Sequence, residues 1–205
     1  MRLVLLGVTG GGKSTLGNTI LRKKRFLSRT SKTSKCTIES VEMKCESAAE
    51  NVNGIEVKVV DTTGFNDLFR AKDEIKEVAT SIKLLAPGPH VFLIVLNPTR
   101  FYSTDRRFLK DIEALLGTEV LYKYAMVVFT RKMEIDFDMD WQSIHEFVRA
   151  RCCDEVQQFI SKCNNRVIAV ENLCSKVAKD AESERVLNFV GDLIQNNNNS
   201  YYKCA

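Results

Sequence analysis

Residues 7–14 read GVTGGGKS and are the most informative segment of this chain. It follows the short apolar run RLVLL at 2–6, which predicts a buried strand, and it leads into a segment at 13–21 whose apolar residues have helical spacing. A glycine-rich turn between a strand and a helix, in the pattern G-x-x-x-x-G-K-[ST], is typical of a phosphate-binding P-loop. The chain is therefore predicted to bind a nucleoside triphosphate.

Each residue type in this loop has a physical reason. Glycines allow backbone N–H groups to turn toward a phosphate, and the N-terminus of the following helix adds about half a positive charge. Lys13 is expected to reach the β- and γ-phosphate oxygens, and Ser14 to bind Mg²⁺. The nucleotide contacts expected from the loop are Gly7, Thr9, Gly10, Gly11, Gly12, Lys13, Ser14 and Thr15.

A second phosphate-site element follows the apolar run IEVKVV at 55–60. Asp61-Thr62-Thr63-Gly64 has the pattern D-x-x-G, at a place where a neighbouring strand would bring a carboxylate to Mg²⁺ and a glycine N–H to the γ-phosphate. Asp61 and Gly64 are therefore predicted to contact the nucleotide, and Asp61 also the metal. A further hydroxyl ligand is expected between 28 and 36, where Thr30 and Thr33 are both candidates.

The rest of the chain alternates strand and helix patterns, which predicts an α/β fold: a mostly parallel sheet with helices on both faces. Asn53-Gly54 predicts a hairpin between strands at 37–43 and 55–60, so one edge of the sheet should be antiparallel. A single domain at 1–194 and a polar, flexible tail at 195–205 are expected. The other expected elements are strands at 91–96, 124–130 and 167–170, helices at 71–85, 103–116 and 175–194, and one or two helices at 141–163.

Composition excludes several classes of protein. The 205 residues are 44% hydrophobic and 27% charged, which suffices for a globular core, and no apolar run approaches the ~20 residues of a membrane span. Seven cysteines without paired or metal-binding spacing predict reduced thiols, as in the cytoplasm, and no zinc site. The net charge of +4 is too small to indicate nucleic-acid binding. The basic run RKKRFLSRTSKTSK at 22–35 is either a solvated loop or a surface for phosphates, anionic lipid or an acidic partner.

Together with these motifs, the segment GPHVFLIVLNPTRFYSTD at 88–105 resembles the GTPases of immunity-associated proteins, the GIMAP family of septin- and dynamin-related G proteins. GVTGGGKSTLGNTIL at 7–21 and VVDTTGFND at 59–67 carry the same resemblance, which covers nearly the whole chain. FTRK at 129–132 and Asn172 resemble the family's fourth and fifth nucleotide motifs. The resemblance implies a Ras-like P-loop GTPase fold that binds GTP or GDP with Mg²⁺.

The resemblance also implies roles for individual residues. Thr33, rather than Thr30, is the implied switch threonine, with a part in catalysis and on the metal. The implied metal ligands are Ser14, Thr33 and Asp61. The implied base site consists of Thr130, Arg131, Lys132, Glu134 and Asn172.

Three positions depart from the family's pattern. The acidic residue that pairs with the N1 and N2 groups of guanine is Met133 here, so either Glu134 takes over or base discrimination is weaker. Glu171 replaces the first of two paired asparagines. Phe65 stands where Ras-type enzymes have a water-orienting glutamine, which predicts slow hydrolysis by an isolated monomer. Arg100 is the candidate for a catalytic charge supplied in trans, ahead of Arg106 and Arg107.

The expected function is a regulatory GTPase whose nucleotide state controls association with a second copy or a related G domain through the switch face. A nucleotide-locked scaffold with negligible turnover is the alternative. A small-molecule kinase would need an arginine-rich lid, and a nucleic-acid-binding module would rest on the run 22–35 alone, so neither is favoured. The resemblance implies a cytoplasmic location or the surface of intracellular membranes, with membrane association only through a region outside this chain.

Overall fold

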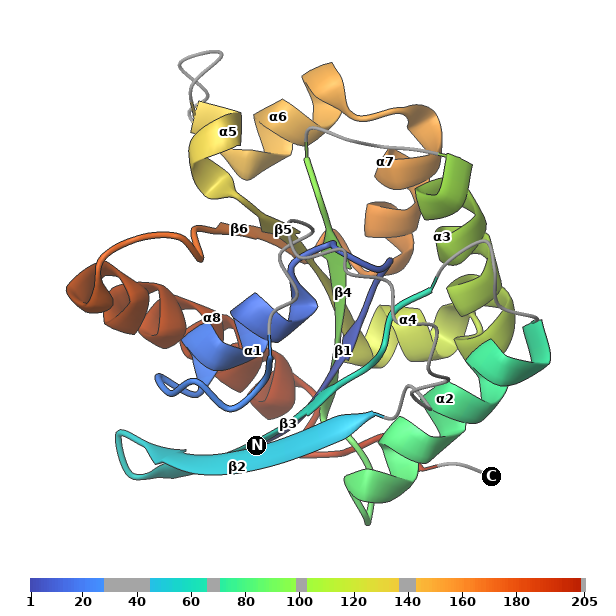
Figure 1. The fold of residues 1–205 in the computed structure, drawn as a ribbon. Helices are drawn as coiled ribbons and strands as arrows, with labels where there is room; N and C mark the ends of the chain where they lie inside the picture. Colours follow the sequence, from blue (N-terminus) through green and yellow to red (C-terminus); the bar gives the residue numbers. More distant parts are fainter. Residues whose placement is uncertain (28–44, 66–70, 99–102, 137–142, 204–205) are drawn as a thin grey trace, which may run out of the picture.

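Six strands in the described residues form one sheet that is parallel except at one edge (Figure 1). The computed structural model describes residues 1–27, 45–65, 71–98, 103–136 and 143–203. The strands are β1 (Arg2–Leu6), β2 (Glu46–Val52), β3 (Ile55–Asp61), β4 (Val91–Leu96), β5 (Ala125–Thr130) and β6 (Val167–Val170), in the spatial order β2-β3-β1-β4-β5-β6. Because β1 lies between β3 and β4, the loop that follows it starts near the middle of the sheet's C-terminal edge.

Helices cover both faces of this sheet. On one face lie α1 and α8, and on the other lie α2, α3, α4, α6 and α7 (Figure 1). The bounds of the helices are α1 (Lys13–Ile20), α2 (Ala71–Leu84), α3 (Ser103–Leu116), α4 (Thr118–Tyr124), α5 (Lys132–Asp136), α6 (Ile144–Arg151), α7 (Asp154–Lys162) and α8 (Lys176–Asn196). The α/β class with a largely parallel sheet is confirmed. Within the described residues, none of the helices combines the length and apolar character that crossing a membrane requires.

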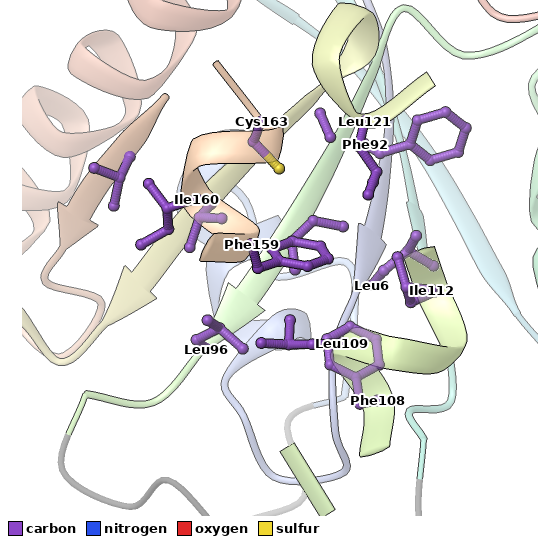
Figure 2. Packing of buried hydrophobic residues seen from close by; sticks show 14 of the residues in the cluster. Leu6, Phe92, Leu96, Phe108, Leu109, Ile112, Leu121, Phe159, Ile160 and Cys163 are labelled. Carbon is purple, nitrogen blue, oxygen red and sulfur yellow. The ribbon is translucent and has the colours of Figure 1, made fainter. Parts of the chain in front are cut away.

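Two hydrophobic cores lie on opposite faces of the sheet because strand side chains alternate in direction. On β1, Leu3 and Leu5 pack toward α1 and α8, whereas Val4 and Leu6 pack toward the other layer of helices. All six residues of β4 are buried, as a central parallel strand requires. Figure 2 shows the core on the face covered by α2, α3, α4, α6 and α7. In this core, side chains of α3 such as Phe108 pack near the end of β1. Packing in these two cores holds in place the C-terminal edge of the sheet, where the glycine-rich loop and the D-x-x-G segment lie.

The predicted hairpin exists, but its first strand starts later than expected. β2 pairs antiparallel with β3 over residues 46–52, and the predicted strand at 37–43 lies outside the described residues. The turn has Asn53 and Gly54 at φ 52° and 83°, as the Asn-Gly pair predicted. The sequence ESAAENV carries no strand signal, because most of the side chains of this edge strand are exposed or half-exposed and no apolar alternation is needed.

The helices α4 and α5 were not predicted. α4 starts directly after Gly117, whose φ is 80°, and α5 starts after Arg131, whose φ is 56°. With seven and five residues, these helices are too short to show a convincing apolar stripe. The segment at 141–163 contains two helices, α6 and α7, separated at Cys152 and Cys153.

The C-terminal segment differs from the flexible tail expected after residue 194. α8 continues to Asn196, and the Tyr202 N–H donates to the Pro89 carbonyl oxygen at 2.8 Å. The Tyr202 ring packs edge-on against Phe92, with centroids 5.5 Å apart, and against Tyr124 at 6.4 Å. Burial of aromatic surface holds this segment at the start of β4, at the end of the sheet opposite the glycine-rich loop.

Candidate functional site

The glycine-rich loop joins β1 to α1 at the C-terminal edge of the sheet (Figure 1). Gly10 and Gly12 have left-handed backbone conformations, with φ of 80° and 98°. At Gly7 there is no room for a side chain, because a Cβ atom would lie 2.5 Å from the carbonyl oxygen of Val95. Glycine is therefore required for the loop to turn tightly beside β4 and deliver the chain to the N-terminus of α1.

Lys13 is buried inside this loop. Its side chain is 5% exposed, and Nζ donates to the carbonyl oxygens of Gly7 and Val8 at 3.1 and 3.0 Å. Burial lowers the pKa of Lys13 to about 8, although the nearby carboxylates of Asp61 and Glu77 oppose the shift. An ammonium enclosed by loop backbone at a helix N-terminus forms a strong site for a phosphate group.

Ser14 and Asp61 form a pair beside the ammonium. Ser14 Oγ donates to Asp61 Oδ2 at 2.5 Å. The other carboxylate oxygen, Oδ1, is buried and has no hydrogen-bond partner within the described part of the chain. Burial raises the pKa of Asp61, while the Ser14 hydrogen bond and the Lys13 charge oppose this. A buried, unpaired carboxylate oxygen next to a serine hydroxyl fits the oxygen ligands that Mg²⁺ prefers.

Backbone hydrogen bonds dock the D-x-x-G segment onto the loop. The Thr9 N–H donates to the Phe65 carbonyl oxygen at 3.0 Å, and the Phe65 N–H donates to the Gly7 carbonyl oxygen at 3.1 Å. Gly64 has a φ of 100°, and a Cβ atom there would lie 2.5 Å from Lys13 Nζ. Gly64 is thus held directly beside the ammonium, where a side chain would collide with it.

The side chain of Phe65 points away from this polar surface. It is 4% exposed, and its ring packs on Phe108 of α3 with the centroids 4.8 Å apart. A phenyl ring has no donor or acceptor with which to orient a water molecule. This position therefore contributes to the core.

Glu77 of α2 is a charged neighbour that the sequence patterns did not indicate. Its carboxylate accepts the backbone N–H of Thr63 and, at 3.7 Å, the thiol of Cys45. Burial is the largest cause that raises the pKa of Cys45 to about 12, and the Glu77 carboxylate adds to it. Glu77 thus attaches the middle of the D-x-x-G segment to α2.

Thr130, the last residue of β5, holds the glycine-rich loop from the other side. Its hydroxyl donates to the Gly11 carbonyl oxygen at 3.0 Å and lies 3.4 Å from the Leu96 carbonyl oxygen. A Cβ atom on Gly12 would lie 2.9 Å from the Thr130 methyl group. The structure therefore places Thr130 against the loop backbone, where it positions the loop.

The segment after Thr130 carries the other predicted base-site residues. The guanidinium of Arg131 pairs with the carboxylate of Glu134 at 3.1 Å, and both side chains are partly exposed. Lys132 begins α5, and Met133 exposes 53% of its surface. Among the described side chains of residues 131–135, none provides a buried acceptor in the place of the missing acidic residue.

Two buried polar residues, Glu171 and Asn172, follow β6, and the first of them contacts this segment. Glu171, 8% exposed, accepts the backbone N–H of Met133 at Oε2 (3.1 Å) and that of Leu173 at Oε1 (2.7 Å). Asn172 is 4% exposed, and neither its amide oxygen nor its amide nitrogen has a hydrogen-bond partner among the described residues. Buried polar atoms are rarely left unpaired, so Asn172 marks a place where a polar ligand would be accommodated.

The predicted residues thus come from loops at one edge of the sheet: after β1, β3, β5 and β6. Thr15 is in the first turn of α1 beside Ser14. Thr33 and Arg100 lie outside the described residues, so their predicted roles stay predictions.

The model of the AIG1 family matches residues 1–205. The chain belongs to the AIG1 family. Among AIG1-type relatives, immune-associated nucleotide-binding protein 9 of Arabidopsis thaliana is 32% identical over 98% of this chain, and GTPase IMAP family member 8 of Mus musculus is 29% identical over 90%. The chain spans 57% and 25% of the lengths of these two relatives. The resemblance to the GTPases of immunity-associated proteins is confirmed.

The fold of this AIG1-family chain is also similar to that of solved GTPases. Toc33 from Arabidopsis thaliana, in complex with GDP and Mg²⁺, superimposes with a TM-score of 0.67 at 18% sequence identity. The match covers 96% of this chain and 84% of Toc33. The likeness confirms the P-loop GTPase fold that the sequence predicts.

Proposed function

We propose that this AIG1-family chain binds guanine nucleotides with Mg²⁺ and acts as a regulatory GTPase. The observation that carries the proposal is the buried cluster in which the Lys13 ammonium lies beside the Ser14–Asp61 pair, with the Asp61 Oδ1 atom left unpartnered in the described residues. The names of its relatives, which include immune-associated nucleotide-binding proteins and GTPases, support the same function.

The proposed roles follow from the geometry of the cluster. Backbone N–H groups of residues 9–15 surround the β-phosphate, and Lys13 neutralises the β- and γ-phosphate oxygens. Ser14 and Asp61 would hold Mg²⁺, together with the predicted ligand Thr33. When bound, the ion supplies positive charge that stabilises the phosphate oxygens during phosphoryl transfer. The Gly64 N–H is the proposed donor to the γ-phosphate.

The base site is proposed to lie between the β5 and β6 loops. Thr130 holds the glycine-rich loop, Arg131 and Lys132 line the approach to the base, and Asn172 offers its buried amide to it. These loops are adjacent because β5 and β6 pair in parallel.

We further propose that a single chain hydrolyses GTP slowly and that association with a partner stimulates this hydrolysis. The buried Phe65 orients no water, so a group from outside must contribute, and Arg100 is the proposed source in trans. Dimerization is important for the GTPase activity of the chloroplast translocon components atToc33 and psToc159, whose fold is similar. A second copy of this chain or a related G domain is the proposed partner across the switch face.

A nucleotide-locked scaffold is the second candidate, and the burial of Phe65 favours it. The two functions separate when specific GTPase activity is measured over a range of protein concentrations. A regulatory GTPase with a residue supplied in trans gains specific activity as dimers form, and Arg100→Ala removes that gain. Specific activity that stays flat while dimers form would favour the scaffold.

Guanine binding itself is tested by calorimetric titration of nucleotide-free protein with GDP and with ADP in the presence of Mg²⁺. We expect GDP to bind at least about tenfold more tightly, a difference of about 1.4 kcal/mol. Equal affinities would mean that the site binds nucleotides without selecting guanine. No binding of either nucleotide would reject the proposal.

Asp61→Asn is expected to abolish most of the gain in GDP affinity that Mg²⁺ provides. The substitution removes the negative charge next to Ser14 but keeps the size of the side chain, so the loss reports on the ion. GDP affinity is measured with Mg²⁺ and with a chelator, and the ratio is expected to fall at least about tenfold. Asp111→Asn on α3, whose carboxylate pairs with Arg107, is the matched control. An unchanged ratio in Asp61→Asn would remove Asp61 from the metal site.

GDP affinity is expected to fall as the pH rises above about 8. Below this pKa, Lys13 is charged in both the free and the bound protein, so its titration does not affect binding. Above it, the free protein has lost the proton that the phosphate complex retains, and binding must take it up again. The affinity is then expected to weaken by up to about tenfold per pH unit, measured between about pH 7 and about pH 9. A flat profile over this range would contradict the depressed pKa of Lys13.

A further inference from the structure

We propose that Glu171 reads the guanine base, in the role that an acidic residue at position 133 would otherwise have. This inference rests on the proposed binding of guanine nucleotides at the same site. Glu171 stands directly after β6, 38 residues from the position that it replaces.

The position of the carboxylate supports this role. Glu171 Oε2 accepts the backbone N–H of Met133 at 3.1 Å, so the carboxylate lies against the residue whose own side chain has no acceptor. Oε1 accepts the N–H of Leu173 at 2.7 Å. These two bonds fix the carboxylate between the β5 and β6 loops, while the side chain of Met133 points outward, 53% exposed.

The carboxylate retains the capacity to bind a base. Each carboxylate oxygen has about two acceptor positions, and the backbone bonds described occupy one on each oxygen of Glu171. Guanine presents N1–H and an N2 amino group side by side, a pair of donors that a carboxylate accepts in bidentate fashion. The chemistry therefore matches the edge of guanine that carries these donors.

Asn172 supplies a second, independent observation. Its amide is 4% exposed and unpartnered within the described chain, next to Glu171. The amide nitrogen is a donor, and guanine O6 is an acceptor. Adenine has an amino donor at this place and an acceptor at N1, so it would set a lone pair against the Glu171 carboxylate. The two residues together favour guanine over adenine.

Glu134, the nearest acidic residue in sequence, is less suited to this role. Its carboxylate pairs with Arg131 at 3.1 Å, and 39% of the side chain is exposed. Glu171 is 8% exposed, and a desolvated acceptor discriminates more strongly between bases that do and do not offer a donor.

The test compares the affinities of GDP, inosine diphosphate and xanthosine diphosphate for the wild-type chain and for Glu171→Gln. Inosine lacks the 2-amino group, and xanthine has a carbonyl oxygen there. The wild type is expected to prefer GDP over both. In Glu171→Gln the new amide N–H donates to the xanthine carbonyl, so the preference for GDP over xanthosine diphosphate is expected to fall at least about tenfold. Glu113→Gln on α3, which removes the same negative charge from a carboxylate that pairs with Lys162, is the control and is expected to keep the preference.

Any of the following results would overturn the inference. Equal weakening of all three nucleotides by Glu171→Gln would show that the carboxylate only holds the two loops together. A shift of base preference in Glu134→Gln instead would assign the role to Glu134. Binding of GDP and ADP with equal affinity by the wild type would show that no residue reads the base. If the wild type binds no nucleotide at all, the proposed function fails together with the inference. If the wild type binds GDP but Glu171 does not affect the base preference, only the inference fails.

Met133→Asp keeps the test decisive if Glu171→Gln does not fold, because the side chain of Met133 is exposed and tolerates polar substitution. With Glu171 already in place, a second carboxylate repels the first, so selectivity for GDP over xanthosine diphosphate is expected not to increase. A tenfold or larger increase in this selectivity would show that the wild-type site lacked an acceptor and would overturn the inference.

Discussion

Lys13→Ala is expected to weaken GDP binding at least about 100-fold, which corresponds to about 2.7 kcal/mol. The Lys13 ammonium is held by the Gly7 and Val8 carbonyl oxygens, so it reaches a phosphate without having to be ordered on binding. Hydrogen bonds to charged groups contribute about 1.5–3 kcal/mol each, and the alanine variant loses those to the phosphate oxygens. The alanine variant keeps the glycines of the loop and all of its backbone N–H groups.

Calorimetry on Lys13→Ala and on Lys162→Ala measures this loss. Lys162 pairs with Glu113 between α7 and α3, so its removal changes the same charge without touching the loop. Thermal unfolding of the nucleotide-free variants shows whether Lys13→Ala is folded, and because the desolvated ammonium costs free energy in the folded state, we expect no loss of stability. Affinity within about threefold of the wild type would contradict the phosphate role of Lys13.

Phe65→Gln is expected to lower the free energy of unfolding by about 3 kcal/mol or more, without raising GTP turnover. The substitution introduces the glutamine that Ras-type enzymes use, but the side chain at this position packs on Phe108 in the core. Removing a buried ring leaves a cavity, and an amide placed there lacks hydrogen-bond partners. Residue 65 thus has the same place in the sequence as that glutamine, but its side chain lies in the core.

Urea unfolding and single-turnover GTP hydrolysis test both parts of this prediction. Phe189→Gln on α8 is the matched control, because Phe189 is 46% exposed and its replacement is expected to change stability by less than about 1 kcal/mol. A Phe65→Gln variant that keeps wild-type stability and hydrolyses GTP faster would show that residue 65 faces the nucleotide when it is bound. That result would favour catalysis by a single chain over stimulation in trans.

The glycine-rich loop of the candidate phosphate site is the part of this protein that local sequence predicts best. Residues 7–14 are contiguous, and their backbone conformations depend on glycines at Gly10 and Gly12 that are visible in the sequence. The hairpin turn at Asn53-Gly54 is similarly local. By contrast, the sequence pattern does not indicate β2 at 46–52, because an exposed edge strand has no apolar alternation to reveal it.

The surroundings of the site depend on contacts between distant segments. Asp61 meets Ser14 across 47 residues because β3 lies next to β1, and Glu171 meets Met133 across 38 residues because β6 lies next to β5. Glu77 reaches Thr63 only through the placement of α2. The sequence pattern of one segment does not indicate which polar side chain will contact a loop from a distant part of the chain.

The α/β class, the glycine-rich loop and the D-x-x-G carboxylate can be predicted from the residues alone, because these features depend on short-range backbone geometry and on hydrophobic alternation. Three other features become visible only in the folded chain: Phe65 belongs to the core, Glu77 holds the D-x-x-G segment, and the buried carboxylate at Met133 is that of Glu171. Burial and pairing depend on which strands and helices are neighbours, and the order β2-β3-β1-β4-β5-β6 fixes which loops lie together.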